Sequence, residues 1–247
     1  MKKIDGFTLK IIAIIAMLIN HIGGGFAPWI IPQSVGMYEA TLWIGRLTFP
    51  IMAFMVAEGF HYTRNKWKYL GRMALFWGIS IYPFYLLFHS TSREFQLVDL
   101  VNNIFFTLMI GLLLIIICDM VQLIWLEIPL AFLFALLTYF SDWGFMGVLT
   151  IYGFYRIKND FLRKTVPIIY TCAIFFYQMY TELYLVNPLG YPMGIIMTAW
   201  GGLLVIPLLL MYNGKRGYSP AWMKWGFYLF YPVHLVLLVV IRNIFFL

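Results

Sequence analysis

Long apolar runs follow one another along the whole chain, each interrupted by charged residues or by a cluster of proline and glycine. A helix that crosses the hydrocarbon core of a membrane uses about 20 apolar residues, which is the length of most of these runs. The pattern predicts an all-α fold, a polytopic transmembrane helix bundle of about nine spans. The predicted spans are 8–29, 41–60, 70–88, 103–121, 123–140, 143–156, 165–186, 193–212 and 222–246.

Composition supports this architecture and excludes a water-soluble globule. Hydrophobic residues make up 63% of the 247 positions and charged residues only 11%, whereas a soluble domain carries about 25% charged residues. Nine spans leave no room for a separate soluble domain, so residues 1–247 are expected to form a single transmembrane domain. The two cysteines, Cys118 and Cys172, lack metal-ligand spacing and are expected to be core residues.

The basic residues give the expected orientation. The chain has a formal net charge of +7, and cytoplasmic loops of membrane proteins carry an excess of lysine and arginine. With alternating spans, 14 of the 17 basic residues fall on the N-terminal side of the membrane, and only Arg93 and Arg242, with Arg46 inside a span, fall elsewhere. The N-terminus is therefore expected in the cytoplasm and the C-terminus outside, and the basic residues indicate topology rather than nucleic-acid binding. The start, Lys2 and Lys3 before the run 11–19, lacks a cleavage site and is expected to be an uncleaved first helix.

A few polar residues lie inside the predicted spans, where a charge at mid-membrane costs about 2.5–3.5 kcal/mol. His21 follows Thr8 by about thirteen residues, which at 1.5 Å per residue places it roughly 20 Å along the first span. Arg46 lies a few residues inward from the external end of the second span, at a similar depth. His234 lies roughly 18 Å along the last span. The three side chains are therefore expected in one layer of the external half.

Other polar positions surround this layer in the sequence. Pro50 lacks the backbone donor for the carbonyl of Arg46, and breaks of this kind usually line a cavity. Asn103 and Asp142 stand at the external ends of spans, where they also have a simpler interpretation as helix caps. A buried histidine can likewise be a hydrogen-bonded packing residue, and the Tyr231-Pro232 pair beside His234 is also typical of a plain kink.

Acyl transfer needs a base for the attacking amine or hydroxyl and a donor for the oxyanion that develops on the carbonyl. His21 and Arg46 match these two roles. Ion transport would place acidic residues at mid-membrane, whereas Glu58, Asp119, Glu127, Asp142 and Glu182 all fall near span ends. The absence of an internal repeat also weighs against a transporter. The residues favour an enzyme.

Five segments, in order and nearly end to end, resemble the TraX family, membrane proteins named for acetylation of F-type conjugative pilin. They are Leu9–Ala13 leading into Asn20-His21-Ile22-Gly23, Gly45–Pro50 leading into Glu58-Gly59-Phe60, Asn102–Thr107, Asp142-Trp143-Gly144, and Phe230–Leu235. One position departs from the family pattern, since an aspartate often precedes the first-helix histidine and here the residue is Asn20. A neutral neighbour orients His21 less strongly.

The resemblance implies a bacterial cytoplasmic membrane acyltransferase that transfers acetyl from acetyl-CoA to an amine, on a peptide N-terminus or a small molecule. We expect His21 as base, Arg46 as carbonyl stabiliser and His234 as a second histidine. Phosphates of acetyl-CoA require cationic partners, and the densest basic segment predicts a donor site at Glu58, Arg64, Lys66, Lys68 and Arg72. The acceptor would meet Asn20, Asn103, Asp142 and Tyr231. The expected partners are membrane lipids and the acyl acceptor. A small-molecule transporter or exporter is the alternative, and an inactive assembly factor is a third possibility.

Overall fold

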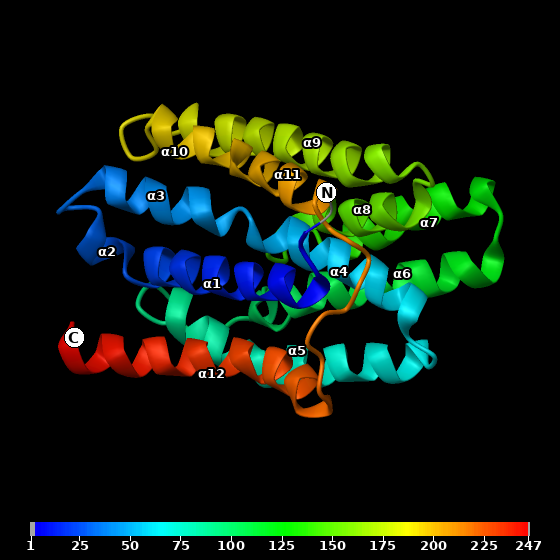
Figure 1. Cartoon of the computed structure of the whole chain (residues 1–247). Coiled ribbons are helices and arrows are strands. Elements are labelled where there is room, and N and C mark those ends of the chain that lie inside the picture. Colours follow the sequence, from blue (N-terminus) through cyan, green and yellow to red (C-terminus); the bar gives the residue numbers. More distant parts are fainter. Residues whose placement is uncertain (1–2, 247) are drawn as a thin grey trace. The chain divides into compact units, whose positions relative to one another are not determined.

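The structure is a computed structural model that describes residues 3–246. Over these residues it is helical throughout and contains no β-strand, which confirms the predicted fold class (Figure 1). Lys2, counted above among the basic residues, lies outside the described range. The elements are α1 (Gly6–Gly25), α2 (Ala27–Ile30), α3 (Val35–Gly45), α4 (Thr48–Tyr62), α5 (Lys66–Phe88), η1 (Leu97–Leu100), α6 (Ile104–Val121), α7 (Ile124–Leu137), α8 (Gly144–Arg156), α9 (Asp160–Met179), η2 (Tyr180–Tyr184), α10 (Met193–Met197), η3 (Thr198–Leu204), α11 (Val205–Leu210) and α12 (Ala221–Phe245).

Each predicted span coincides with helical structure, but not all of them are long and apolar enough to cross a membrane alone. Among the described residues six stretches meet that requirement: Gly6–Gly25, Val35–Tyr62, Lys66–Phe88, Ile104–Val121, Met193–Leu210 and Ala221–Phe245. The predicted spans 123–140, 143–156 and 165–186 correspond to α7, α8 and α9, which are shorter or less apolar. Several spans of this kind define a multi-pass membrane protein.

The helices group into two compact units. The first contains residues 3–52 and 160–219, and the second contains residues 53–159 and 220–246. Helix α4 begins in the first unit and continues into the second. The sequence gives no sign of this division, because the apolar pattern is the same on both sides of each boundary.

In the first unit α1 packs against α3, and α9 packs against η3 (Figure 1). The buried side chains between α3, α9 and α10 are Leu42, Met179, Ile195, Ile196 and Ala199. A short parallel bridge between Ile4 and Tyr212 joins the chain start to the segment after α11.

Regular helix stops between α3 and α4, at Arg46 and Leu47. Pro50 explains the break, because proline has no N–H to donate to the carbonyl four residues earlier. The predicted second span, 41–60, is therefore two helices, and Arg46 occupies the C-cap of α3. A charged side chain next to irregular backbone inside an apolar helix pair is unusual enough to mark a candidate site.

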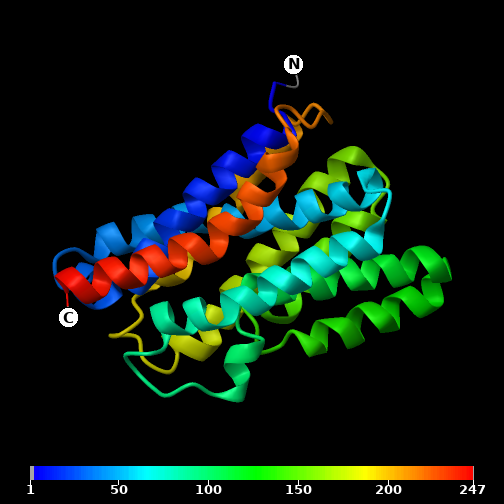
Figure 2. The same ribbon diagram turned by 90° about the horizontal axis from the view of Figure 1, so that it is seen from below.

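In the second unit α6 packs against α5, α7 and α8, and α12 packs against α5. Figures 1 and 2 show α6 turning back directly into α7 at one end of the unit. The turn follows Gln122, which has a left-handed backbone (φ 53°) at the C-cap of α6. The apolar core here includes Leu114, Cys118, Ala135 and Val148.

The connection between α5 and α6 is held by charged and polar side chains. Arg93 donates both Nη groups to Asp99, each at 2.6 Å, and Asp99 is 2% exposed. The hydrogen bonds from Arg93 hold the pKa of Asp99 below its usual range. Asn102 Nδ2 donates to His89 Nε2 at 2.9 Å, because an amide nitrogen cannot accept, and burial lowers the pKa of His89. This connection is therefore an ordered part of the second unit.

Arg242 of α12 closes the C-terminal end of α5. Its side chain is 3% exposed, and Nη1 and Nη2 donate to the carbonyl oxygens of Leu87 and Leu86 at 2.6 and 2.7 Å. The last carbonyls of a helix have no partner within the helix, and water is scarce in an apolar bundle. A buried guanidinium thus stabilises both the helix end and the packing of α5 on α12.

Replacing Arg242 by leucine should destabilise the second unit by about 2–5 kcal/mol, because charge-assisted hydrogen bonds are lost and two buried carbonyls are left unsatisfied. Unfolding of the purified protein in mixed detergent micelles measures the change. Arg216→Leu is the matched control, since Arg216 is exposed in a loop. Equal stability of the two variants would contradict the capping role.

Candidate functional site

The first-unit candidates lie where α1 and α3 are in close contact. Asn20 packs directly on Gly45, and a Cβ added at Gly45 would lie 2.5 Å from both Cβ and Cγ of Asn20. Further along the same antiparallel pair, Gly23 faces Thr41. His21, one residue after Asn20, is 5% exposed. The turn that carries His21 therefore meets the end of α3 that carries Arg46, as the sequence predicted for this pair of helices. The depth of the two residues in the membrane stays a prediction.

The guanidinium of Arg46 is directed toward α9. Its Cζ lies 4.4 Å from the centroid of the Phe175 ring, a distance at which a cation and an aromatic face attract each other. The Cβ of Arg46 also lies against Gly201 of η3, where an added Cβ would be 3.1 Å away. Arg46 thus occupies the junction of α3, η3 and α9, and its aromatic contact keeps the guanidinium within apolar surroundings.

His234, the second histidine, belongs to the second unit. It is 4% exposed, its ring stacks on Phe230 at 4.6 Å, and Nδ1 lies 2.7 Å from the carbonyl oxygen of Phe230. A carbonyl only accepts, so Nδ1 carries a proton and donates this hydrogen bond. Tyr231 lies one helical turn before His234 and is 2% exposed. The centroids of the two rings are 5.6 Å apart.

Three of the predicted acceptor residues lie together in the second unit. Tyr231 packs edge-on against Phe105 at the start of α6, with Asp142 near enough to interact with it electrostatically. Asn103 is fully buried, and its Oδ1 accepts from Phe105 N at 3.1 Å, which confirms the helix-cap interpretation. Asp142 is not a cap, because Trp143 occupies the N-cap of α8 in a left-handed conformation (φ 67°). Asn20, the fourth predicted residue, is in the first unit.

Buried hydroxyl groups that sequence reasoning missed hold this region. Thr107 donates to the carbonyl of Asp142 at 2.7 Å and shares a 2.7 Å hydrogen bond with Ser141. Thr138 donates to the carbonyl of Gly144 at 3.1 Å. In the sequence, only the segment Asn102–Thr107 stood out, because it resembles the family. That resemblance did not indicate a role for the hydroxyl group of Thr107.

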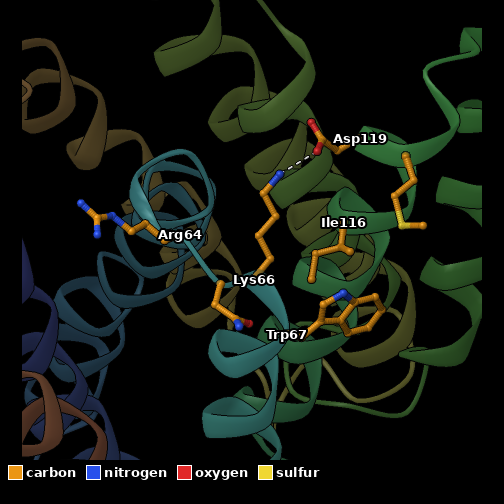
Figure 3. A pocket seen from close by; sticks show the side chains of 7 residues that line it. Arg64, Lys66, Trp67, Ile116 and Asp119 are labelled. Atoms are coloured by element: carbon orange, nitrogen blue, oxygen red, sulfur yellow. Dashed lines mark hydrogen bonds and ion pairs between the residues drawn. The ribbon is translucent and has the colours of Figure 1, made fainter.

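The predicted donor segment borders an open pocket of about 390 Å³ in the second unit (Figure 3). Lys66 Nζ lies 2.6 Å from Asp119 Oδ2, so the first turn of α5 is tied to the last turn of α6. Figure 3 shows Arg64 at the rim, with its guanidinium directed away from this ion pair. The lining residues are Arg64, Asn65, Lys66, Trp67, Ile116, Asp119 and Met120.

The other predicted donor-site residues do not line the pocket. Lys68 is exposed on the first turn of α5, and Arg72 lies 5.5 Å from the Tyr69 ring and beside Tyr228. Glu58 is buried on α4, with 7% of its surface exposed. The structure thus brings Arg64 and Lys66 together at one pocket and disperses the remaining three.

The sequence also provided no indication of a buried cluster of charged and polar side chains around Glu127. Glu127 at the start of α7 is 4% exposed; Tyr152 donates to its Oε2 at 3.1 Å, and Arg156 Nε lies 3.0 Å from the same oxygen. The sequence placed Glu127 near a span end without a partner. Its pairing with α8 explains why a carboxylate is tolerated there. Within the described residues no group of three or more histidine, cysteine, aspartate or glutamate side chains is arranged to hold a metal.

The fold and these sites define a multi-pass membrane protein with buried histidine and arginine side chains in its helical units. Comparison with known proteins identifies the family. The TraX family model, described as TraX protein, matches residues 5–242. The chain is also 33% identical, over 239 residues, to a probable fimbrial assembly protein FimC, serogroup H1, of Dichelobacter nodosus; the match covers 95% of this chain and 94% of that protein. The chain belongs to the TraX family. No solved structure matches it.

Replacing Gly45 by alanine should destabilise the first unit by about 1–3 kcal/mol, because the new methyl group overlaps Asn20 and forces α1 and α3 apart. The matched control is Gly78→Ala on α5, where nothing lies within 4 Å of the added Cβ. That change should be neutral or should stabilise by about 0.5–1 kcal/mol. Unfolding curves of both variants in the same detergent test the prediction, which fails if the two are equally stable.

Proposed function

We propose that this chain is an integral membrane acyltransferase that moves an acetyl group from acetyl-CoA to an amine. The observation that supports this most is the close approach of α1 and α3, which holds buried His21 next to the helix break at Arg46. A base and a cation at one depth of an apolar bundle are the two groups that acyl transfer requires. The Dichelobacter nodosus relative is described as a probable fimbrial assembly protein. We propose a fimbrial subunit as the acceptor, through its N-terminal amine.

The proposed chemistry uses these two side chains in turn. The acceptor nitrogen attacks the acetyl carbonyl carbon, and His21 takes the proton that the nitrogen loses. Arg46 stabilises the negative charge that develops on the carbonyl oxygen. The carbon–sulfur bond then breaks, the proton passes from His21 to the thiolate that leaves, and an amide is formed. His234 is proposed as a second histidine, since it is buried and the hydrogen bond from its Nδ1 to the carbonyl of Phe230 orients the ring.

The proposed donor site is the pocket at Arg64 and Lys66. Acetyl-CoA supplies a thioester whose carbonyl carbon is open to attack, together with phosphates that need cationic partners. Lys66 is held over the Phe60 ring at 3.9 Å, so its charge is already positioned on the pocket wall. A pocket of about 390 Å³ falls within the range of small-molecule sites.

Replacing His21 by alanine should lower acetyl transfer by about 10²–10⁴-fold, the usual cost of losing a general base. The assay follows release of free thiol from acetyl-CoA and labelling of an acceptor amine by purified protein. Donor binding and the unfolding curve should change little.

His89→Gln is the matched control, because His89 serves the α5–α6 connection and should leave the rate unchanged. Arg46→Gln should reduce the rate by about 10²–10³-fold through loss of the oxyanion donor. A folded His21→Ala protein with normal turnover would remove His21 from the mechanism. Solute movement without thioester cleavage would indicate a transporter.

Charge reversal at the pocket should weaken acetyl-CoA binding more than charge reversal elsewhere. We expect Arg64→Glu/Lys66→Glu to raise the KM for acetyl-CoA, whereas Lys215→Glu/Arg216→Glu, in an exposed loop, should leave it near normal. Steady-state kinetics with varied donor concentration measures both. Equal effects would mean that all four residues act only on topology.

The proposed topology has nine spans, the N-terminus in the cytoplasm and the C-terminus outside, in a bacterial cytoplasmic membrane. Three contacts support it. Gly6 N donates to the carbonyl of Lys215, so the basic N-terminal and 213–219 segments lie at one end of the first unit. The Lys66–Asp119 and Arg156–Glu127 pairs likewise join alternate helix ends in the second unit, as alternating spans require. Basic residues then gather at the cytoplasmic end of each unit.

A reporter fused after Leu247 should be active only outside the cytoplasm, and one inserted at the exposed Lys158 should be active only inside. Alkaline phosphatase and green fluorescent protein fusions report the two sides. A cytoplasmic reporter at Leu247 would contradict an odd number of spans.

A further inference from the structure

The pocket of the second unit is lined by an aromatic ring (Trp67), a cation (Lys66) and a carboxylate (Asp119). Trp67 and Lys66 come from the first turn of α5, and Asp119, Ile116 and Met120 come from the last turns of α6. Figure 3 shows Lys66 extended toward Asp119, with the indole of Trp67 beside Ile116. A site for phosphate alone needs only a cation. The indole offers a further contact surface, so the pocket suits a ligand that carries a planar group as well as phosphate.

Lys66 is suited to hold a phosphate without leaving its partner. An ammonium group has three N–H donors, of which one is directed to Asp119 at 2.6 Å. The side chain is 31% exposed, and its Nζ rests over the Phe60 ring. These contacts fix the position of the charge while leaving donors for an anion at the pocket mouth.

Trp67 is suited to stack on a planar base. Its side chain is 59% exposed although it lines the pocket, and Ile116 lies next to it. Stacking of a nucleobase on an aromatic ring needs one open face and is tolerant of the base. The indole therefore provides affinity for a base but does not choose among bases.

Asp119 positions the cation. Its Oδ2 accepts from Lys66 at 2.6 Å, and its side chain is 40% exposed. The carboxylate therefore holds the ammonium group on the pocket wall. It does not distinguish adenine from guanine, because both bases present an exocyclic amino group to an acceptor.

We propose that this pocket binds the adenine nucleotide end of the acyl donor, with Trp67 stacked on adenine and Lys66, held by Asp119, on the 5′-diphosphate. The proposal rests on the proposed function for the identity of the whole donor. It adds the part of the donor that is recognised and the residues that bind it. Arg64 at the rim adds positive charge but makes no defined contact.

Isothermal titration of the full-length protein in detergent with ADP, GDP and inorganic pyrophosphate tests the proposal. We expect ADP and GDP to bind about equally and pyrophosphate to bind more weakly than either. Trp67→Ala should weaken ADP binding roughly 5- to 150-fold, the effect of losing one base–aromatic stack, and leave pyrophosphate unchanged. Trp67→Phe should retain most of the affinity.

Trp125→Ala is the matched control, because Trp125 is 83% exposed at the start of α7, outside the pocket lining. Equal losses in Trp67→Ala and Trp125→Ala would overturn the proposal in favour of interfacial anchoring. Equal binding of ADP and pyrophosphate would overturn it in favour of a phosphate site. Loss of ADP binding when phosphatidylglycerol is added to the micelles, with no dependence on Trp67, would identify a lipid headgroup site instead.

A kinetic measurement separates this proposal from the proposed function. If acetyl transfer occurs and Trp67→Ala raises the KM for acetyl-CoA with kcat unchanged, both stand. Acetyl transfer with a normal KM in Trp67→Ala overturns the pocket assignment alone. Binding of ADP that depends on Trp67, without any acetyl transfer, supports the pocket assignment and overturns the acyltransferase.

Discussion

Polar backbone groups inside an apolar bundle have to find partners within the protein, and this constraint accounts for most of the buried polar side chains. Arg242 satisfies the last carbonyls of α5, Asn103 caps α6, and Thr107 binds the carbonyl of Asp142 before α8. Each contact lies at a helix end, where the helix cannot supply its own partners. Polar side chains at such places are structural first, and a catalytic role needs a separate argument.

The catalytic roles proposed for His21 and Arg46 rest on their positions. His21 is buried in α1, four residues before its last residue, Gly25. Arg46 lies at the end of α3, with its guanidinium over the Phe175 ring. The close contact of Asn20 with Gly45 joins the two positions and tolerates no larger residue at Gly45. A rigid helix pair of this kind supports precise placement of reacting groups.

The sequence predicted the elements that depend on local pattern. Apolar run length located helical structure at every predicted span, although only six stretches are long and apolar enough to cross a membrane alone. A fixed rise per residue placed Asn20-His21 opposite the end of α3. Contacts between segments far apart in the chain could not be predicted from this local pattern. Arg242 reaches carbonyls 155 positions away, and Lys66 pairs with Asp119 across 53 positions. Trp67 was missed because exposed tryptophans are common near membrane surfaces, so the residue type alone carries no signal. The division into two units was missed because both have the same apolar pattern.

The Lys66–Asp119 pair also determines how this end of the second unit responds to ionic strength. At physiological salt, charges separated by more than about 8 Å are largely screened. The neighbouring cations Arg64 and Lys68 are exposed and therefore contribute little to long-range attraction of anions. The 2.6 Å contact of Lys66 with Asp119 is short enough to survive such screening. At physiological salt an anionic ligand of this pocket would thus be held mainly by direct contact rather than drawn in from a distance.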